Sequence, residues 1–567
     1  MSKFGRVLVA SAWPYVNYTP HLGTVIHLIS ADVAARYYRL KGEEVVMVSG
    51  SDEHGTPTEV EAIKQGITPK QLTDKNHAKI VELCKKWCLS FSNYTRTESP
   101  VHKKFVQELL MKIYDNGYIF TQETEMLYCE KCSRFLPDRF VEGKCPYCGY
   151  EHARGDQCAD SCGRLLEPTF LIEPYCAICK NKPIVKRTKQ WYFDLSKFSQ
   201  RLNDYINNNA QLPSNARNFS LNWLKEGLRP RTVTRDIEWG IPAPFPGAEG
   251  KSVYVWFDAV LGYVSATIEY FRNQVDPEKW REFWFDRNVK TIYFIGKDNI
   301  PFHTIILPAL LLGSGENYNL PWNVSATEFL QFKGEKFSKS HRVGMWIDEA
   351  MELFPADYWR FFLMAARPEM KDANFTWELF LEKINADLND TLGNFIHRTL
   401  TFINMQFNSE IPKAATLDES DKQILTSLKD KVEVLAREIE DCKLQSAANT
   451  LIGIGRMGNQ YLNEKEPWNL IKKDREKAAN ILCVATQIVK ALAIVSAPFV
   501  PFTAEELCKT LNLPESFEEQ KWEEALKPLP TQHKIIKAKP LFKKIEADEK
   551  KLDEMLARIR ERLSTNA

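Results

Sequence analysis

The chain has 567 residues, of which 44% are hydrophobic and 26% charged, and its formal net charge is +1. The length exceeds the roughly 250–300 residues at which one hydrophobic core stops growing, so several domains are expected. The balanced charge excludes a global basic field for nucleic acid and leaves only local patches. No uninterrupted apolar run approaches the ~18 residues of a membrane span, and the N-terminus lacks a signal-peptide pattern, so we expect a cytoplasmic protein that contacts no membrane.

Residues 6–49 predict a strand, a turn, a helix and a second strand. The apolar run 7–10 precedes a pattern from Ile26 to Leu40 in which apolar residues recur every three or four positions, as in a helix. Residues 45–48 form a short apolar run typical of a buried parallel strand. These segments make a βαβ unit, and its first turn carries the sequence TPHLGTVIH.

The first turn of this unit combines features that suit an anion. A helix N-terminus offers unpaired N–H groups and a partial positive charge, which attract phosphate. Gly23 allows a ligand close to the backbone, while His21 and Thr24 supply hydrogen-bond donors. The turn has neither the Walker pattern nor the GxGxxG fingerprint. Taken alone, the motif favours an ordinary helix-capping loop with a surface histidine over a phosphate site.

Residues 121–190 are rich in cysteine, glycine and proline and show little periodicity, which indicates an inserted module. Eight of the thirteen cysteines lie there as the pairs 129/132, 145/148, 158/162 and 176/179. Such pairs predict zinc held by four thiolates, and eight cysteines allow two structural sites. Spacing alone favours sequential grouping, with the first two pairs on one ion and the last two on another. The remaining five are interpreted as small core residues: Cys84, Cys88, Cys442, Cys483 and Cys508.

Residues 253–257 and 291–296 predict two further strands, and 301–312 predict an apolar helix. Together with the first unit they indicate an α/β fold, a doubly wound parallel-sheet (Rossmann-type) domain split by the zinc-knuckle insertion. Strand patterns then vanish, and the amphipathic patterns of 385–510 predict an α-helical bundle. The tail 534–564 predicts a charged amphipathic helix that packs on the body.

A second motif, GEKFSKSH, occupies residues 334–341. Lys336 and Lys339, with the hydroxyls of Ser338 and Ser340, follow a glycine that can act as a hinge. Two lysines and two hydroxyls on such a loop suit a mobile clamp on a polyphosphate, whose charge builds up in a transition state. On composition alone, a solvated basic loop remains the default interpretation.

The two motifs, placed at opposite ends of a split doubly wound domain, resemble the HIGH and KMSKS signatures of the class I aminoacyl-tRNA synthetases. Further segments resemble the methionyl-tRNA synthetase family, over residues 6 to about 545. The four cysteine pairs resemble the archaeal and eukaryotic-type subgroup, and no appended C-terminal module for tRNA binding or dimerisation is recognised. The family segments are GSDEHGTP (50–57), LPDRFVEGKCPYCGY and GDQC in the cysteine region, VYVWFDAVLGYVSA (253–266), FIGKDNIPFH (294–303) and EPWNL (466–470).

This resemblance implies a ligase that activates L-methionine with ATP and Mg²⁺ to methionyl-adenylate. The enzyme would then transfer methionine to the 3′ end of tRNA(Met), with AMP and pyrophosphate as the released products. A monomer is expected, and a separate tRNA-binding protein that acts in trans remains open. The implied boundaries are a catalytic domain at 1–120 and 231–325, a connective insertion at 121–230, a KMSKS-loop and stem-contact region at 326–385, an anticodon-binding helical domain at 386–545 and a tail helix at 546–567.

The resemblance also implies roles for individual residues in ATP and methionine binding. It places Asp52 against the α-ammonium group of methionine. A separate set of residues would contact each of four groups: the ATP phosphates, the ATP ribose, the methionine side chain and the anticodon. These sets are His21, Gly23, Thr24, Lys336, Ser338, Lys339 and Ser340 for the phosphates, Gly296 and Asp298 for the ribose, Trp13, Tyr15, Trp256, Ala259, Tyr263 and His303 for the side chain, and Asn394, Arg398 and Trp468 for the anticodon.

For the cysteines, the family implies nested rather than sequential grouping. The inner pairs would hold the first zinc and the outer pairs the second. These sets are Cys145, Cys148, Cys158 and Cys162, and Cys129, Cys132, Cys176 and Cys179.

The sequence departs from the family pattern at three points. Thr24 replaces the second histidine of the HIGH motif, Val260 replaces a proline beside the methionine pocket, and Cys158 and Cys162 are spaced CxxxC rather than CxxC. Two alternatives also remain. One is a class I relative for leucine, valine or cysteine, although the insertion is short for an editing domain. The other is a tRNA- or protein-binding paralogue without catalysis.

Overall fold

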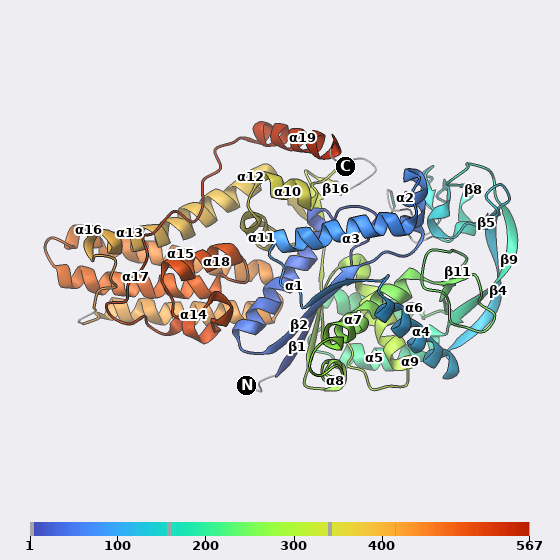
Figure 1. The fold of residues 1–567 in the computed structure, drawn as a ribbon, viewed down its shortest axis with the longest axis horizontal. Coiled ribbons are helices and arrows are strands. Elements are labelled where there is room, and N and C mark those ends of the chain that lie inside the picture. Colours follow the sequence, from blue (N-terminus) through green and yellow to red (C-terminus); the bar gives the residue numbers. More distant parts are fainter. Residues whose placement is uncertain are drawn as a thin grey trace.

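The computed structural model describes residues 5–565, apart from 156–157, 159–160, 163, 165, 338–342 and 414–415. A sheet-containing part, mostly blue and green in Figure 1, joins a group of long helices in orange and red. The cysteine-rich insertion lies at the end of the molecule opposite these long helices (Figure 1).

A five-stranded parallel sheet forms the centre of the first part, in the order β14–β13–β1–β2–β3. In its register, Leu8 of β1 pairs with Thr291 on one side and Val46 on the other. The strands are nearly continuous apolar runs because helices cover both faces. Helix α1 (Leu22–Leu40) connects β1 to β2, so the predicted βαβ unit and the predicted fold class are confirmed. The strands are β1 (Arg6–Ser11), β2 (Glu44–Ser51), β3 (Asn93–Arg96), β13 (Lys290–Gly296) and β14 (Asn323–Thr327).

The two faces of the sheet belong to two hydrophobic cores. On one face, Leu8 and Val48 belong to a core that includes α4, α7 and α9. On the other face, Val7 and Val9 pack with α1 and α11, and this core continues into the helices α13–α18, called the helical domain below. The helices are α4 (Pro100–Asp115), α7 (Val255–Arg272), α9 (Leu307–Gly313), α11 (Ala356–Ala365), α13 (Asn394–Gln406), α14 (Glu419–Glu440), α15 (Leu444–Lys465), α16 (Pro467–Leu470), α17 (Arg475–Val495) and α18 (Pro501–Thr510).

Among the described helices, α17 alone combines the length and the apolar composition of a membrane span. By length and composition alone it could cross a membrane, but 89% of its apolar window is buried inside the protein. Such burial is typical of the central helix of a globular helical domain.

The prediction of a strand at residues 253–257 is wrong. Only Ser252–Val253 is a strand (β12), and the following residues begin α7 with Tyr254 as its N-cap. A short apolar run cannot distinguish a buried strand from a buried helix, and here helical apolar spacing continues to Phe271.

Two long strands also form where the composition shows little periodicity. Strands β4 (Ile119–Cys129) and β9 (Ile184–Phe193) pair antiparallel along almost their whole length and carry the cysteine insertion at their tip. At the other end of the chain, the predicted tail helix is α19 (Glu549–Thr565), which contacts α10 (Ile347–Leu353) and α12 (Trp377–Leu381).

A buried arginine joins the sheet-containing part to the helical domain. Arg360 of α11 is fully buried and donates a hydrogen bond of 2.6 Å to Asp32 of α1, which is also fully buried. The same guanidinium donates to the backbone carbonyls of Trp87, Pro498 and Phe499, at 3.1, 2.9 and 3.3 Å. The last two carbonyls lie between α17 and α18, so one side chain connects three separate parts of the fold.

Candidate active site

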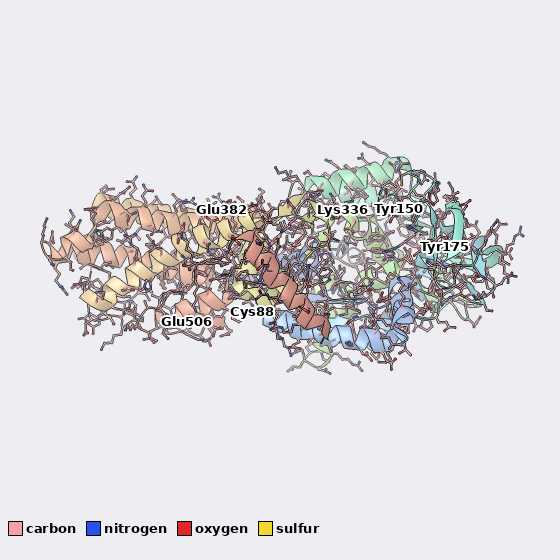
Figure 2. The ribbon with its side chains drawn as sticks, turned by 90° about the horizontal axis from the view of Figure 1, so that it is seen from above. Cys88, Tyr150, Tyr175, Lys336, Glu382 and Glu506 are labelled. Carbon is pink, nitrogen blue, oxygen red and sulfur yellow. The ribbon has the colours of Figure 1, made fainter. Side chains whose placement is uncertain are left out.

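A pocket of about 400 Å³ opens at the carboxyl ends of the parallel strands. Residues after β1, β2 and β13 line it, together with the N-terminus of α1 and the first turns of α7. Ligands of doubly wound sheets bind at this edge, because the loops that follow the strands converge there. Lys336, one of its lining residues, lies in the middle of the molecule, between the helical domain and the insertion marked by Tyr150 and Tyr175 (Figure 2).

The pocket brings together the residues that the sequence places around ATP and methionine. Every one of them that the structure describes is a lining residue, although they come from five separate segments of the chain. Ser338, Lys339 and Ser340 lie outside the described residues. The lining residues from the predicted set are Trp13, Tyr15, His21, Gly23, Thr24, Asp52, Trp256, Ala259, Tyr263, Gly296, Asp298, His303 and Lys336.

The N-terminus of α1 faces this pocket with a histidine at its cap. His21 is the N-cap residue in an extended conformation, and its side chain does not cap the helix. Its Nε2 lies 3.4 Å from Oγ1 of Thr24, one turn further on. At Gly23 an added Cβ would stand 3.1 Å from the His21 ring, so glycine leaves the imidazole its space. This arrangement keeps a donor-rich helix start open to an anion.

Asp52 is the buried carboxylate of the pocket. It is 3% exposed, and its Oδ1 has no hydrogen-bond partner among the described residues. Burial, and then the nearby negative charge of Asp258, raise its pKa well above the ordinary value. A buried acceptor without a donor costs free energy, so the site suits a ligand that brings a cation.

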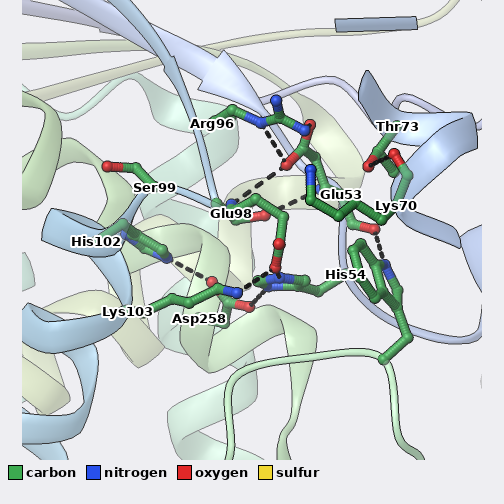
Figure 3. A network of polar contacts seen from close by, with 12 residues as sticks. Glu53, His54, Lys70, Thr73, Arg96, Glu98, Ser99, His102, Lys103 and Asp258 are labelled. Atoms are coloured by element: carbon green, nitrogen blue, oxygen red, sulfur yellow. Dashed lines mark hydrogen bonds and ion pairs between the residues drawn. The ribbon is translucent and has the colours of Figure 1, made fainter. Parts of the chain in front are cut away.

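Figure 3 shows a buried network of histidines and carboxylates that includes His54 and Asp258, whose charges act on Asp52. Asp258 of α7 accepts from Nδ1 of His54 and Nε2 of His102, both at 2.6 Å. The other nitrogen of His54 is 2.8 Å from Glu98. Burial lowers the pKa of His54, but Asp258 and Glu98 together raise it to about 9. Burial raises the pKa of Asp258, but His54 and His102 lower it to about 2. The network therefore holds a buried imidazolium between two carboxylates.

Aromatic rings form the apolar wall of the pocket. Trp256 stacks on Phe302, with ring centres 3.9 Å apart, and Tyr15 meets Trp256 edge-on. Tyr263 and His303 are joined by a hydrogen bond of 2.7 Å. Burial lowers the pKa of His303 to about 4. The neutral ring donates a hydrogen bond from Nδ1 to the carbonyl of Asn299, at 2.9 Å, and so accepts the hydrogen bond of the Tyr263 hydroxyl at Nε2.

Trp13 lines the same pocket and lies against two glycines. An added Cβ at Gly50 or at Gly262 would stand 2.6 Å from the nearest atom of its six-membered ring. The indole also meets Tyr263 edge-to-face, with ring centres 6.4 Å apart. Glycine at both positions therefore leaves free the space that the Trp13 ring occupies.

Several lining residues were not predicted from the sequence. His27 follows Thr24 by one helical turn, and its Nε2 is 2.9 Å from Oγ1 of Thr327. Burial, and then Arg367, lower the pKa of His27 to about 3, so the ring is neutral. The spacing of polar residues at 21, 24 and 27 is the signal that could have identified it. Phe337 stacks on His21, with ring centres 4.5 Å apart, and no sequence signal indicates this pair.

The eight cysteines of the insertion form two groups, each with all four sulfur atoms within 4.8 Å of one another. The grouping is nested, not sequential. In tetrahedral coordination at ~2.3 Å from zinc, sulfur atoms stand about 3.8 Å apart. The structure has 3.4 Å from Cys129 to Cys179 and 3.9 Å from Cys132 to Cys176 in the outer group. The inner group has 3.9 Å from Cys145 to Cys162 and 3.6 Å from Cys148 to Cys158, so both donor sets fit a zinc ion, including the CxxxC pair.

The three residues assigned to the anticodon lie close to one another in the helical domain. The guanidinium of Arg398 lies over the Trp468 ring, 4.9 Å from its centre, and donates to Asn463. Asn394 is exposed one turn earlier on α13. Trp468 is 38% exposed, which leaves its ring available for stacking.

Comparisons with known proteins match the whole described architecture. The model "tRNA synthetases class I (M)" matches residues 7–400, and "Anticodon binding domain of methionyl tRNA ligase" matches residues 411–560. The methionine--tRNA ligase of Korarchaeum cryptofilum is 52% identical, and the match covers 98% of each chain. That of Caldivirga maquilingensis is also 52% identical, over 97% of this chain and 94% of the relative. The structure of Mycobacterium tuberculosis methionyl-tRNA synthetase in complex with methionyl-adenylate has the same fold, with a TM-score of 0.79 at 22% identity over 95% of this chain and 99% of that one.

Proposed function

Because this chain belongs to the methionyl-tRNA synthetase family and is a methionine–tRNA ligase, we propose that the pocket holds methionine and ATP side by side. The observation that carries this proposal is the convergence of the predicted residues on one cavity at the carboxyl edge of the sheet. One carboxylate oxygen of methionine attacks the α-phosphorus of ATP, and the bond to the pyrophosphate breaks. A hydroxyl of the tRNA 3′ end then attacks the methionyl carbonyl carbon, and AMP leaves.

Activation needs orientation and charge stabilisation rather than a base, since the methionine carboxylate is already ionised. We assign Asp52 to the α-ammonium group, because it lines the cavity and one of its buried oxygens has no hydrogen-bond partner among the described residues. Gly296 and Asp298 follow β13, where a carboxylate can accept from ribose hydroxyls. ATP would enter with Mg²⁺, which neutralises part of the phosphate charge.

The phosphates would lie between the start of α1 and the KFSKS segment. His21, Gly23 and Thr24 would supply donors from the start of α1, and Lys336 lines the same cavity. Lys339 is proposed to act with Lys336 on the departing pyrophosphate, and Ser338 and Ser340 to bind phosphate oxygens. These donors stabilise charge that is largest in the transition state.

The methionine side chain would lie against the aromatic wall of Trp13, Tyr15, Trp256 and Tyr263, with Ala259 and His303 completing the slot. A thioether is polarisable and meets ring edges favourably. Discrimination against leucine then rests on shape and on weak sulfur contacts, each worth roughly 1–3 kcal/mol.

The tRNA would contact the two ends of the molecule. Asn394, Arg398 and Trp468 suit unpaired anticodon bases, which are recognised by stacking and by hydrogen bonds to base edges. The insertion 121–230 would lie near the acceptor end. The same proposal includes the domain boundaries stated above, a monomeric state and a cytoplasmic location. Binding assays with added proteins would test for a tRNA-binding protein that acts in trans.

We assign one structural zinc ion to each cysteine group. Four thiolates fill a tetrahedral coordination shell and leave no position for substrate, so each ion would only hold the insertion together. Metal analysis of protein purified without chelator is expected to give close to two zinc ions per chain.

Paired substitutions distinguish the nested from the sequential grouping. Cys129→Ser with Cys176→Ser removes ligands from one nested group and should leave about one zinc ion per chain. Cys129→Ser with Cys145→Ser, the matched control, removes a ligand from each group and should leave almost none. The reverse result in the two variants would establish sequential grouping.

The function itself is tested by ATP–pyrophosphate exchange with single amino acids. Methionine should support exchange, while leucine, valine and cysteine should give little. Exchange with none of them would contradict an activating enzyme. Lys339→Ala should abolish exchange and retain tRNA binding, whereas a binding-only paralogue would show no exchange in either form.

A further inference from the structure

Helix α19 lies across both ends of the segment that carries the KFSKS motif. In Figure 1 it stands apart from the helical domain, and a long extended stretch of chain leads to it. Its apolar side, which includes Leu552 and Leu556, is buried in the same core as α1. At its N-terminal end, Glu549 and Asp553 accept from Nζ of Lys333, at 2.8 and 2.7 Å. Lys333 lies three residues before Lys336, so α19 binds the chain just before the motif.

The C-terminal end of α19 contacts residues 344–349, which follow the motif and are called the return segment below. Arg560 pairs with both carboxylate oxygens of Glu349, at 3.0 and 3.2 Å, and also donates to the carbonyl of Gly344. Its guanidinium lies over the ring of Trp346, 5.6 Å from the centre. Glu349 in turn accepts from the backbone N–H of Trp346, at 3.1 Å. A single arginine therefore makes charge-assisted bonds to the segment that leads from the motif into α10.

This return segment is bonded directly to the start of α1. Trp346 forms an isolated antiparallel bridge with His21, and the N–H of Leu22 donates to the carbonyl of Met345, at 3.0 Å. Phe337 stacks on the imidazole of His21, with planes 14° apart. A Cβ at Gly344 would collide with the Phe337 ring. Phe337 thus fills the space between the active-site histidine and the glycine that Arg560 holds.

We propose that Arg560 is a positioning residue for ATP activation, acting through Gly344 and Phe337 on the orientation of His21. Arg560 is not a lining residue of the pocket, and the inference rests on the proposed role of this pocket. Gly344 has no side chain and a left-handed φ of +132°, which favours glycine, so the bond from Arg560 to its carbonyl restrains a residue with wide intrinsic freedom. Misplacement of a phosphate donor by about 1 Å is enough to slow an orientation-dependent reaction.

The test is ATP–pyrophosphate exchange with Arg560→Ala. We expect kcat/KM for ATP to fall about tenfold, while the dissociation constant of methionine, measured without ATP, stays unchanged. Arg562→Ala is the matched control. It removes the same charge two residues further along α19, where Arg562 forms an exposed ion pair with Glu352, and it should behave as wild type. Equal effects of both variants, an equal loss of methionine affinity, or unchanged kcat/KM for ATP would overturn the proposal.

A second variant separates positioning from general loss of structure. Glu349→Gln keeps an acceptor for the Trp346 N–H but weakens the pair with Arg560, so it should give part of the same ATP defect with an unchanged thermal midpoint. The double variant should be no worse than Arg560→Ala alone, because both act through one contact. Additive defects would contradict a shared path. Wild-type enzyme without any exchange would instead refute the proposed function.

Discussion

Replacing Asp52 with asparagine is expected to abolish most methionine activation. The carboxylate is buried, and one of its oxygens has no partner among the described residues, so the substrate ammonium would complete the pair. Loss of one member of a buried charged pair costs about 2–5 kcal/mol, or roughly 30-fold to several thousand-fold. The loss should appear in kcat/KM for methionine in pyrophosphate exchange, while KM for ATP changes little.

The pH profile adds a second measurement on the same residue. Because burial raises the pKa of Asp52, the carboxylate takes up a proton at a higher pH than an exposed aspartate. Affinity for methionine is therefore present above that pKa and is lost as the pH falls through it; Asp52→Asn should remove this acidic limb. Asp298→Asn is the control, since it lines the same pocket and should raise KM for ATP alone. Equal effects of the two variants on both substrates would contradict the assignment.

Replacing Arg360 with methionine is expected to destabilise the whole molecule. The substitution leaves Asp32 without one of its cations and leaves the carbonyls of Trp87, Pro498 and Phe499 without this donor. Removal of one partner from a buried ion pair costs about 3–5 kcal/mol. For a chain of this size that free energy lowers the thermal midpoint by roughly 2–4 °C.

An exposed arginine of the helical domain provides the control for this measurement. Arg456 is 69% exposed, and its nearest carboxylate oxygen, on Asp387, is 4.0 Å away. Arg456→Met should change the free energy of unfolding by less than about 1 kcal/mol. A midpoint for Arg360→Met that equals that of the control would show that the buried pair does not hold the two parts together.

Much of the architecture could be predicted because its signals are local. The apolar runs of β1, β2 and β13 and the spacing along α1 define the sheet, and the residues that follow each strand meet at one edge by topology alone. The family resemblance adds the roles of Asp52 and the aromatic wall, which the residues by themselves leave open. Most residues that line the pocket can thus be predicted from the sequence together with the family resemblance.

What could not be predicted depends on contacts between distant segments. His54 stands two residues from Asp52, but its charge comes from Asp258 and Glu98, which lie elsewhere in the chain. Spacing along the chain favours sequential grouping of the cysteines. The observed grouping is nested, because β4 and β9 pair and bring residues 129 and 176 together. The stack of Phe337 on His21 likewise joins residues more than three hundred positions apart.

The continuous core between the sheet and the helical domain limits how this protein can be divided. The two matched family models meet near residue 400, yet the apolar sides of α1 and α11 are covered by helices from beyond that point. A fragment that ended there would expose a broad apolar face to water and would aggregate rather than remain a working half. The helical domain therefore cannot be exchanged freely. Any domain that took its place would have to cover the same apolar residues of α1 and α11.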